Sequence, residues 1–264
     1  MKPLVKWSGG KSREIKYFDK YIPSFDKYIE PFVGGGALYF YLNHSDNVIN
    51  DIHPDLINFY QHISYGYGDY IYELMSKYSN TEDDYYYIRD EFEPSNDLER
   101  AFVFFYLRKT CYRGMLRYNK KGHFNVPFGR YKTYNYEILL DKQYNRILRN
   151  TIILNTDVSE VFDMFNDTDN FVFLDPPYDS VFSNYGFCNY DKDKHIELYN
   201  KFITTKNKCL MVIGETDFIK QLYNDYIIDV FKKKYAFKIH SGRISNDINN
   251  NHLIICNYET NTFF

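Results

Sequence analysis

The sequence contains no apolar stretch that approaches the ~20 residues of a membrane-spanning helix, so we expect no association with a membrane. Its four cysteines lie far apart, without the C-x-x-C spacing typical of zinc sites and without the pattern of a disulfide framework. We therefore expect no metal and a reducing, cytoplasmic location. The lack of a signal peptide before the first motif favours the same location.

The chain also lacks the excess of positive charge that is typical of nucleic-acid-binding proteins. Its formal net charge is −3 over 264 residues. Between Ala101 and Tyr136, however, Asp and Glu are absent, and cations alternate with aromatic side chains. These cations are Arg108, Lys109, Arg113, Arg117, Lys120, Lys121, Arg130 and Lys132. Such a segment suits phosphates and bases, although a solvated basic loop is the alternative.

The motif Asp175-Pro176-Pro177-Tyr178 carries the strongest chemical signal. The apolar run at residues 171–174 predicts a buried parallel strand, so Asp175 lies where open α/β sheets bind their ligands. The Asp175 carboxylate and the Pro176 carbonyl can both accept hydrogen bonds from an exocyclic amino group of a planar base. Tyr178 offers that base a flat face. An ordinary strand followed by a proline turn is the alternative.

Three consecutive glycines, Gly34 to Gly36, separate a predicted strand from a predicted helix at residues 38–43. A turn without side chains lets a ligand lie against the backbone at the edge of the sheet. The spacing differs from G-x-G-x-x-G, so the dinucleotide fingerprint is not met. Asp51 ends the next predicted strand and can accept hydrogen bonds from ribose hydroxyls. Alternatively, it caps a helix that begins at Pro54.

The run Lys6-Trp7-Ser8-Gly9-Gly10-Lys11 precedes a predicted helix at residues 12–21. Backbone N–H groups at such a turn can approach an anion or a carboxylate closely. Trp7 and Lys11 flank the turn and can contact a ring and a carboxylate. As an isolated signal, a glycine pair before a helix indicates only a turn.

These motifs and their order resemble the D12 class of adenine-N6 DNA methyltransferases. The resemblance rests on residues 6–11, residues 30–37, Asp51 and the Asp-Pro-Pro-Tyr motif, and it covers nearly the whole chain. It implies methyl transfer from S-adenosylmethionine to N6 of a flipped adenine in duplex DNA, with Asp175, Pro176, Pro177 and Tyr178 as catalytic residues. The residues that it implies for S-adenosylmethionine binding are Trp7, Lys11, Phe32, Gly34, Gly35, Asp51 and Asp175.

Residues 117–129 resemble the DNA-recognition hairpin of the same family, with a turn at residues 119–123. The resemblance implies that DNA is contacted by Tyr112, Arg113, Met115, Arg117, Asn119 and Pro127. In members specific for GATC, the arginine at the Arg117 position reads guanine, and a guanidinium fork suits the O6 and N7 acceptors of that base. Arg113 departs from the family, whose members have a small polar residue such as Asn or Ser there.

The sequence thus predicts an α/β fold with a seven-stranded, mostly parallel sheet of the S-adenosylmethionine-dependent methyltransferase type. Residues 1–59 and 150–264 are assigned to the catalytic domain, and residues 60–149 to an inserted helical DNA-recognition domain. Helices are expected in the insert at residues 70–79, 82–92 and 97–111. After the insert, strands are expected at residues 151–155, 171–175, 209–214, 235–239 and 252–258.

Two alternative functions remain at this point: methylation of adenine in RNA, and DNA binding by a catalytically inactive regulator. The hairpin argues for duplex DNA, and intact Asp51 and Asp175 argue for activity. Asp157 is either a contact for the adenine of the cofactor or a helix N-cap. Residues 179–191 form either a lid over the flipped base or an ordinary surface loop.

Overall fold

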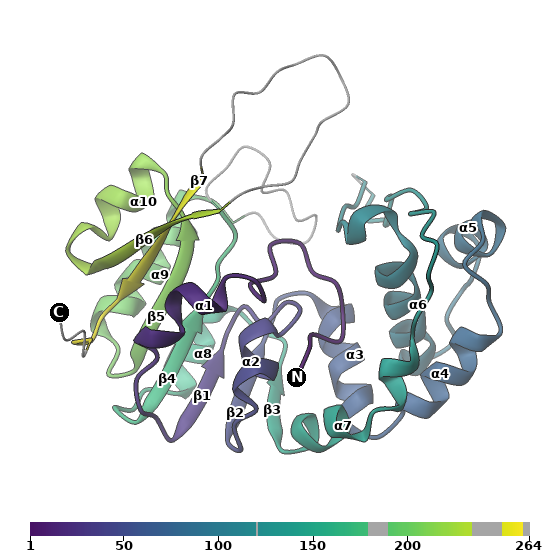
Figure 1. Cartoon of the computed structure of the whole chain (residues 1–264), viewed down its shortest axis with the longest axis horizontal. Coiled ribbons are helices and arrows are strands. Elements are labelled where there is room, and N and C mark those ends of the chain that lie inside the picture. Colours follow the sequence, from purple (N-terminus) through teal and green to yellow (C-terminus); the bar gives the residue numbers. More distant parts are fainter. Residues whose placement is uncertain (120, 179–189, 234–249, 261–264) are drawn as a thin grey trace, which may run out of the picture.

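The computed structural model describes residues 1–119, 121–178, 190–233 and 250–260. Its centre is a seven-stranded sheet with the order β3-β2-β1-β4-β5-β7-β6 (Figure 1). The first five strands along the chain pair with one another in parallel, whereas β7 runs antiparallel to both β5 and β6. The predicted fold class is therefore confirmed. The strands are β1 (Lys27–Glu30), β2 (Asn47–Asn50), β3 (Thr151–Leu154), β4 (Asn170–Leu174), β5 (Lys208–Gly214), β6 (Ile227–Lys233) and β7 (Asn250–Cys256).

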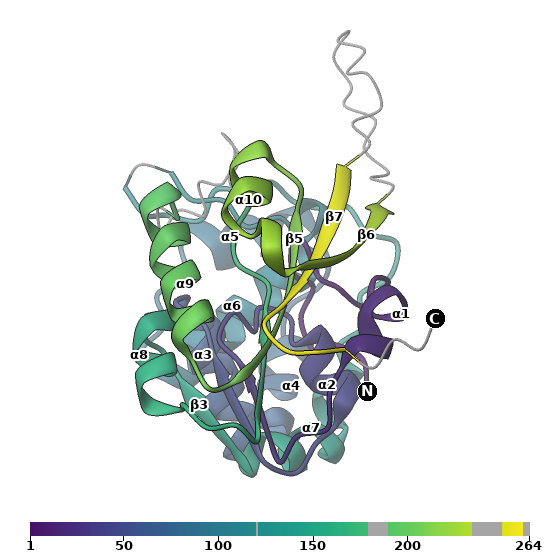
Figure 2. The same cartoon turned by 90° about the vertical axis from the view of Figure 1, so that its left-hand side faces the viewer.

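The central strands are apolar on both sides because helices cover both faces of the sheet. In β4, Phe171 and Phe173 join one buried cluster, and Val172 and Leu174 join another. Figure 2 shows α1 (Ile15–Phe18) and α2 (Ala37–Leu42) on one face of the sheet. The opposite face carries α8 (Val158–Met164), α9 (Lys192–Thr204) and α10 (Asp217–Leu222).

A group of helices lies beside the β3 end of the sheet (Figure 1). It consists of α3 (Pro54–Ser64), α4 (Gly68–Ser76), α5 (Glu82–Asp90), α6 (Asp97–Thr110) and α7 (Lys142–Arg149). The three helices predicted within the insert correspond to α4, α5 and α6, with ends that differ by a few residues. Short 3₁₀ turns occur at Asp19–Tyr21, Tyr112–Gly114, Glu137–Leu140 and Asn224–Tyr226.

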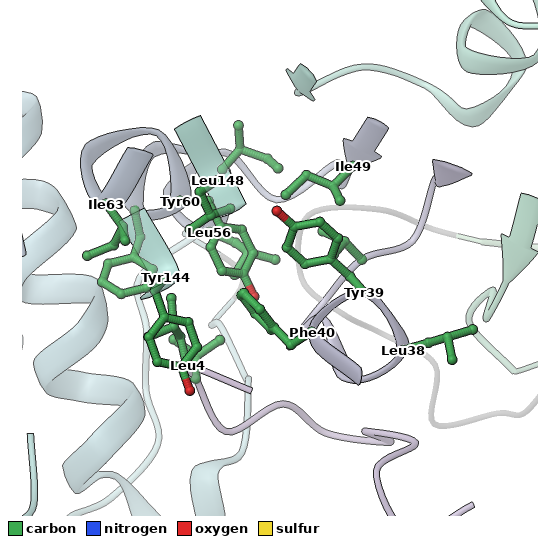
Figure 3. Packing of buried hydrophobic residues seen from close by; sticks show 14 of the residues in the cluster. Leu4, Leu38, Tyr39, Phe40, Ile49, Leu56, Tyr60, Ile63, Tyr144 and Leu148 are labelled. Atoms are coloured by element: carbon green, nitrogen blue, oxygen red, sulfur yellow. The ribbon is translucent and has the colours of Figure 1, made fainter. Parts of the chain in front are cut away.

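Aromatic packing joins the helical group to the sheet. In Figure 3, Phe40 of α2 lies between Tyr60 of α3 and Tyr144 of α7, with ring centroids 6.2 Å and 5.2 Å away, respectively. The same buried cluster extends from Phe173 in the sheet to Phe102 in α6. Helix α3 runs without interruption through the predicted domain boundary at residues 59 and 60.

The structure differs from the sequence prediction at three places. The helix expected at residues 12–21 is shorter, because α1 begins at Ile15 and a 3₁₀ turn replaces its end. Strand β6 occupies Ile227–Lys233, where no strand was predicted, and the predicted strand at residues 235–239 lies outside the described residues. The last strand, predicted at residues 252–258, is displaced to Asn250–Cys256. The described helices include none with the length and apolar character of a membrane span.

Candidate active site

A cleft of about 1280 Å³ opens at the carboxyl ends of the central parallel strands. It lies where β1 and β4 are adjacent. From β1 the chain continues to β2 on one side of this pair, and from β4 it continues to β5 on the other side. Open α/β sheets bind ligands at such switch points. The cleft brings together the three motifs found in the sequence. Its lining includes residues 6–11, the glycine turn, Asp51 and the Asp-Pro-Pro-Tyr motif.

Lys11 connects two of these motifs across 164 residues of sequence. Its Nζ lies 2.5 Å from Oδ1 of Asp175 and 3.0 Å from Oη of Tyr178. The Lys11 side chain is 2% exposed and that of Asp175 is 21% exposed, so the ion pair is largely shielded from water. Burial raises the pKa of the Asp175 carboxyl, and the neighbouring Lys11 ammonium opposes that rise. Lys11 therefore favours the ionised form of the Asp175 carboxyl, at the carboxyl end of β4.

Asp51 holds the glycine turn in place. Its Oδ2 accepts a hydrogen bond from the Gly34 N–H at 2.9 Å, and its Oδ1 accepts one from the His53 N–H at 3.0 Å. Burial raises the pKa of Asp51 to about 6, although these backbone donors act in the opposite direction. The N-cap of α3 is His53, whose Nδ1 accepts from the Leu56 N–H at 3.3 Å. The helix-cap alternative for Asp51 is therefore wrong.

Trp7 lies directly over the glycine turn. A Cβ atom at Gly34 would approach the Trp7 ring to 2.6 Å, so a larger residue would displace the indole. Gly34 also has a φ of +45°, a left-handed conformation that favours glycine. The edge of the turn is formed by Phe32, whose ring meets that of Tyr190 in an edge-on contact at 5.8 Å. A ligand in the cleft is thus flanked by bare backbone and aromatic surface.

Two carboxyl groups near the cleft have defined structural partners. Asp157 caps α8 by accepting from the Ser159 N–H at 2.9 Å, which confirms the N-cap alternative, and it pairs with Lys194 at 3.3 Å. Glu30, at the end of β1, is 3% exposed and accepts from the Tyr28 hydroxyl at 2.8 Å. Burial raises the pKa of Glu30 to about 8, so this carboxyl takes up a proton near neutral pH.

Residues 117–119 and 121–125 pair as the hairpin that the sequence predicts, with few hydrogen bonds between its two sides. The Asn119 N–H donates to the His123 carbonyl at 2.8 Å, and the Asn125 N–H donates to the Arg117 carbonyl at 3.0 Å. One isolated bridge pairs Tyr118 with Phe124. The side chain of Asn119 belongs to the turn itself, since its Oδ1 accepts from the His123 N–H at 3.0 Å.

All six predicted DNA contacts have exposed side chains: Tyr112, Arg113, Met115, Arg117, Asn119 and Pro127. Arg117 is held by Asn125, whose Oδ1 accepts from Arg117 Nε at 2.8 Å and whose carbonyl accepts from Nη2 at 2.6 Å. Among the six, Arg113 lines the cleft. It adopts a φ of 55° and is followed by Gly114 with a φ of 61°.

Three residues near the cleft were missed as functional candidates by sequence reasoning. Arg108 is 1% exposed and lies between the Trp7 loop and the segment that leads into the hairpin. His53 is 3% exposed and contacts Tyr118. Lys109 lines the cleft, and burial lowers its pKa to about 8. The two cations were visible only as members of the basic segment, because their contacts depend on tertiary structure.

Comparison with known proteins finds similarity along most of the chain. The model of the D12 class N6 adenine-specific DNA methyltransferases matches residues 7–241. The chain is 52% identical over 261 residues to the type II methyltransferase M.CviBI of Paramecium bursaria Chlorella virus NC1A, covering 98% of this chain and 100% of that protein. It is 34% identical over 267 residues to the type II methyltransferase M.MjaIII of Methanocaldococcus jannaschii, covering 89% and 88%, respectively. The DNA adenine methylase of Haemophilus influenzae is 31% identical over 238 residues, covering 84% of this chain and 83% of that protein.

Proposed function

The chain belongs to the D12 class of N6 adenine-specific DNA methyltransferases, and we propose that it transfers a methyl group from S-adenosylmethionine to a flipped adenine in duplex DNA. Adenine methylation of DNA follows from the family. The donor, the extruded base and the roles of individual residues are the proposal. The observation that carries it is the Lys11–Asp175 pair beside the glycine turn, at the switch point of the sheet.

The residues of the cleft fit S-adenosylmethionine. The glycine turn is a cradle that a Cβ atom would fill, and Asp51 supplies carboxylate oxygens beside it. Trp7 and Phe32 offer ring surfaces in the same cleft, and Lys11 supplies a cation. When bound, S-adenosylmethionine supplies an electrophilic methyl group on a positively charged sulfur. We assign its binding to Trp7, Lys11, Phe32, Gly34, Gly35, Asp51 and Asp175.

Asp175 orients the adenine amino group. Lys11 donates to Oδ1, and no residue in the described part of the chain donates to Oδ2, so the second oxygen can accept from the amino group. The Pro176 carbonyl is the second acceptor, and Pro177 fixes the turn that presents it. Tyr178 stacks on the base, while Lys11 restrains its hydroxyl. Catalysis then rests on positioning and electrostatics, without a covalent intermediate.

The segment from Tyr112 to Pro127 reads the duplex. Arg113 and Leu116 of this segment line the same cleft as Asp175, so a base extruded from the duplex reaches Asp175. Arg117 reads a guanine in the major groove, and the resemblance implies GATC as the site. For this role the guanidinium must exchange its hydrogen bonds to Asn125 for those to the base. Arg113, which lines the cleft, contacts a phosphate.

Within this proposal, residues 1–59 and 150–264 bind the donor and catalyse transfer, and residues 60–149 recognise the target. Methyl transfer from tritiated S-adenosylmethionine, with unmethylated duplex DNA, adenine-methylated duplex and RNA as acceptors, tests the reaction. We expect label only in the unmethylated duplex, at N6 of adenine. Asp175→Ala should abolish turnover and leave duplex affinity intact. Retention of more than about a tenth of wild-type kcat would show that Asp175 is not the orienting acceptor.

Sequencing of the methylated sites tests the roles of the two arginines. Arg117→Ala should relax the preference for one guanine, because a bidentate contact contributes about 1–3 kcal/mol of discrimination. Arg113→Ala should weaken binding to all sequences and lower the salt slope by about one unit, as expected of a phosphate contact. A changed motif in Arg113→Ala would assign it a base instead. A wild-type motif other than GATC would contradict the proposed site.

A further inference from the structure

Arg108 is a charged side chain buried at the junction between the donor cleft and the DNA-reading segment. It belongs to the last turn of α6 and is 1% exposed. All the acceptors of its described hydrogen bonds are backbone carbonyls. Among the described residues no carboxylate pairs with Arg108, and a buried guanidinium is costly unless its donors are satisfied, so the arrangement of these carbonyls fixes where each segment lies.

The guanidinium joins two segments from opposite sides. On one side, its Nε donates to the Lys6 carbonyl at 3.1 Å, and its Nη2 donates to the same carbonyl. The guanidinium carbon Cζ lies 5.2 Å from the centroid of the Trp7 ring. On the other side, Nη2 donates to the Gly114 carbonyl and Nη1 to the Met115 carbonyl, each at 2.6 Å. Trp7 covers the glycine turn, and Met115 is among the proposed DNA contacts.

A second set of contacts, through His53, links the same two parts of the molecule. The His53 N–H donates to Asp51, and the His53 ring lies 5.7 Å from the Trp7 ring in an edge-on contact. Because Nδ1 accepts from the Leu56 N–H, the neutral ring carries its proton on Nε2. That Nε2 lies 2.8 Å from the hydroxyl of Tyr118, which pairs with Phe124 in the hairpin. Both sets of contacts therefore begin at proposed donor-binding residues and end at the DNA-reading segment.

We propose that Arg108, assisted by the His53–Tyr118 contact, is a positioning residue that couples occupancy of the donor site to DNA binding. The inference rests on the proposed function, in which Trp7 and Asp51 hold the donor. A donor that immobilises Trp7 and the glycine turn also immobilises the Lys6 carbonyl, and through Arg108 it restrains Gly114 and Met115. The duplex then binds a DNA-reading segment that is already ordered. Part of the conformational entropy that this segment loses on DNA binding has therefore been lost beforehand, when the donor binds. By linkage, DNA raises the affinity for the donor by the same factor.

The decisive quantity is the ratio of DNA dissociation constants without and with S-adenosylhomocysteine, measured by fluorescence anisotropy. The DNA is a duplex that carries the site methylated by the wild type. We expect a ratio of at least about five for the wild type, as is typical of coupled sites. Arg108→Lys keeps the charge but removes the planar fork that reaches both segments, so the ratio should fall below about two.

Arg100→Lys is the matched control. It changes the same residue type on the same helix, where Arg100 is 44% exposed and pairs with Asp55. This variant should keep the wild-type ratio. Tyr118→Phe removes only the hydroxyl that contacts His53, and it should lower the ratio as well. Thermal melting shows whether Arg108→Lys is folded, and if it is not, Tyr118→Phe decides the result.

The outcomes separate this inference from the proposed function. If the wild type methylates adenine and binds S-adenosylhomocysteine, but its ratio is one, the coupling does not exist and only the inference is overturned. An undiminished ratio in folded Arg108→Lys overturns it too. A merely structural Arg108 would lower thermal stability or both affinities and leave the ratio unchanged. If the wild type neither binds S-adenosylhomocysteine nor methylates adenine, the proposed function fails and the inference fails with it.

Discussion

Replacing Lys11 by methionine tests whether the Lys11–Asp175 pair sets the charge of the cleft. The two groups lie 2.5 Å apart, with side chains 2% and 21% exposed. Methionine fills similar space but removes the ammonium, which leaves the carboxylate buried without its counter-ion. Removal of one partner of a buried pair costs about 3–5 kcal/mol, and the partial exposure of Asp175 points to the lower figure. We therefore expect Lys11→Met to lower the free energy of unfolding by about 3 kcal/mol near pH 8.

The loss should depend on pH in a defined direction. Burial raises the pKa of Asp175, and Lys11 opposes that rise, so the pKa in Lys11→Met is higher than in the wild type. A carboxyl with a higher pKa in the folded state binds a proton on folding. Its contribution to stability is present at low pH and is lost as the pH rises through the folded-state pKa. The difference between Lys11→Met and the wild type should thus be small near pH 5 and should grow towards pH 8.

Urea unfolding of both proteins across this pH range measures the difference directly. The control is Lys27→Met, which breaks a surface pair of the same 2.5 Å length with Asp46, where the side chains are 26% and 53% exposed. Surface pairs contribute about 0–1 kcal/mol, so the control should lose little. In an Asp175→Asn background, Lys11→Met should also cost little, because no charge is left unpaired. A loss that is independent of pH, or that is equal in both backgrounds, would refute the reasoning.

Substitutions at three further residues, Glu30, Asp51 and Arg113, test other parts of the site. Because the folded-state pKa of Glu30 is about 8, wild-type stability should fall between about pH 5 and pH 8, and Glu30→Gln should flatten that fall in urea unfolding. An unchanged profile would contradict this. Asp51→Ala releases the Gly34 N–H and should weaken S-adenosylmethionine binding in calorimetry by tenfold or more; an unchanged dissociation constant would remove Asp51 from the site. Arg113 has a left-handed φ, so Arg113→Asn should raise stability by about 1 kcal/mol and Arg113→Val should lower it; equal melting temperatures would contradict both.

The strands of the sheet were predictable where the local sequence carries a clear signal, such as an apolar run or a glycine turn at the end of the strand. Residues 171–174 are entirely apolar, because β4 is buried on both faces, and the glycine turn and Asp51 mark where two other strands end. Strand β6 lacks this signal. Charged Asp229 interrupts it, Val230 is 46% exposed, and a bulge between Ile227 and Asp229 shifts its register. An edge strand, which pairs with a neighbour on one side and not on the other, does not require a continuous apolar pattern.

The residues of the candidate site also fall into two groups: those that the local sequence predicts and those whose contacts depend on tertiary structure. Asp175 and the glycine turn were found because each lies at the end of a strand, and the sequence around each strand end suffices to place it. The partner of Asp175 was not predictable, since Lys11 is 164 residues away and a lysine beside a glycine pair is equally suited to solvent. The resemblance placed both residues at the donor site without placing them in contact. Geometry alone revealed that one ammonium serves both Asp175 and Tyr178.

Arg108 shows why a basic segment cannot be divided into functional and structural cations from sequence. Eight cations follow Ala101 without a neighbouring acid, and all of them suit phosphate. In the fold, Arg108 points inward and is satisfied by carbonyls, whereas Arg117 is exposed. The difference arises because Trp7 and Gly114, more than 100 residues apart, close over the end of α6. Arg108, one of the eight cations that suit phosphate by sequence, is buried among carbonyls, so the effect on DNA binding proposed for it must pass through the backbone that it holds.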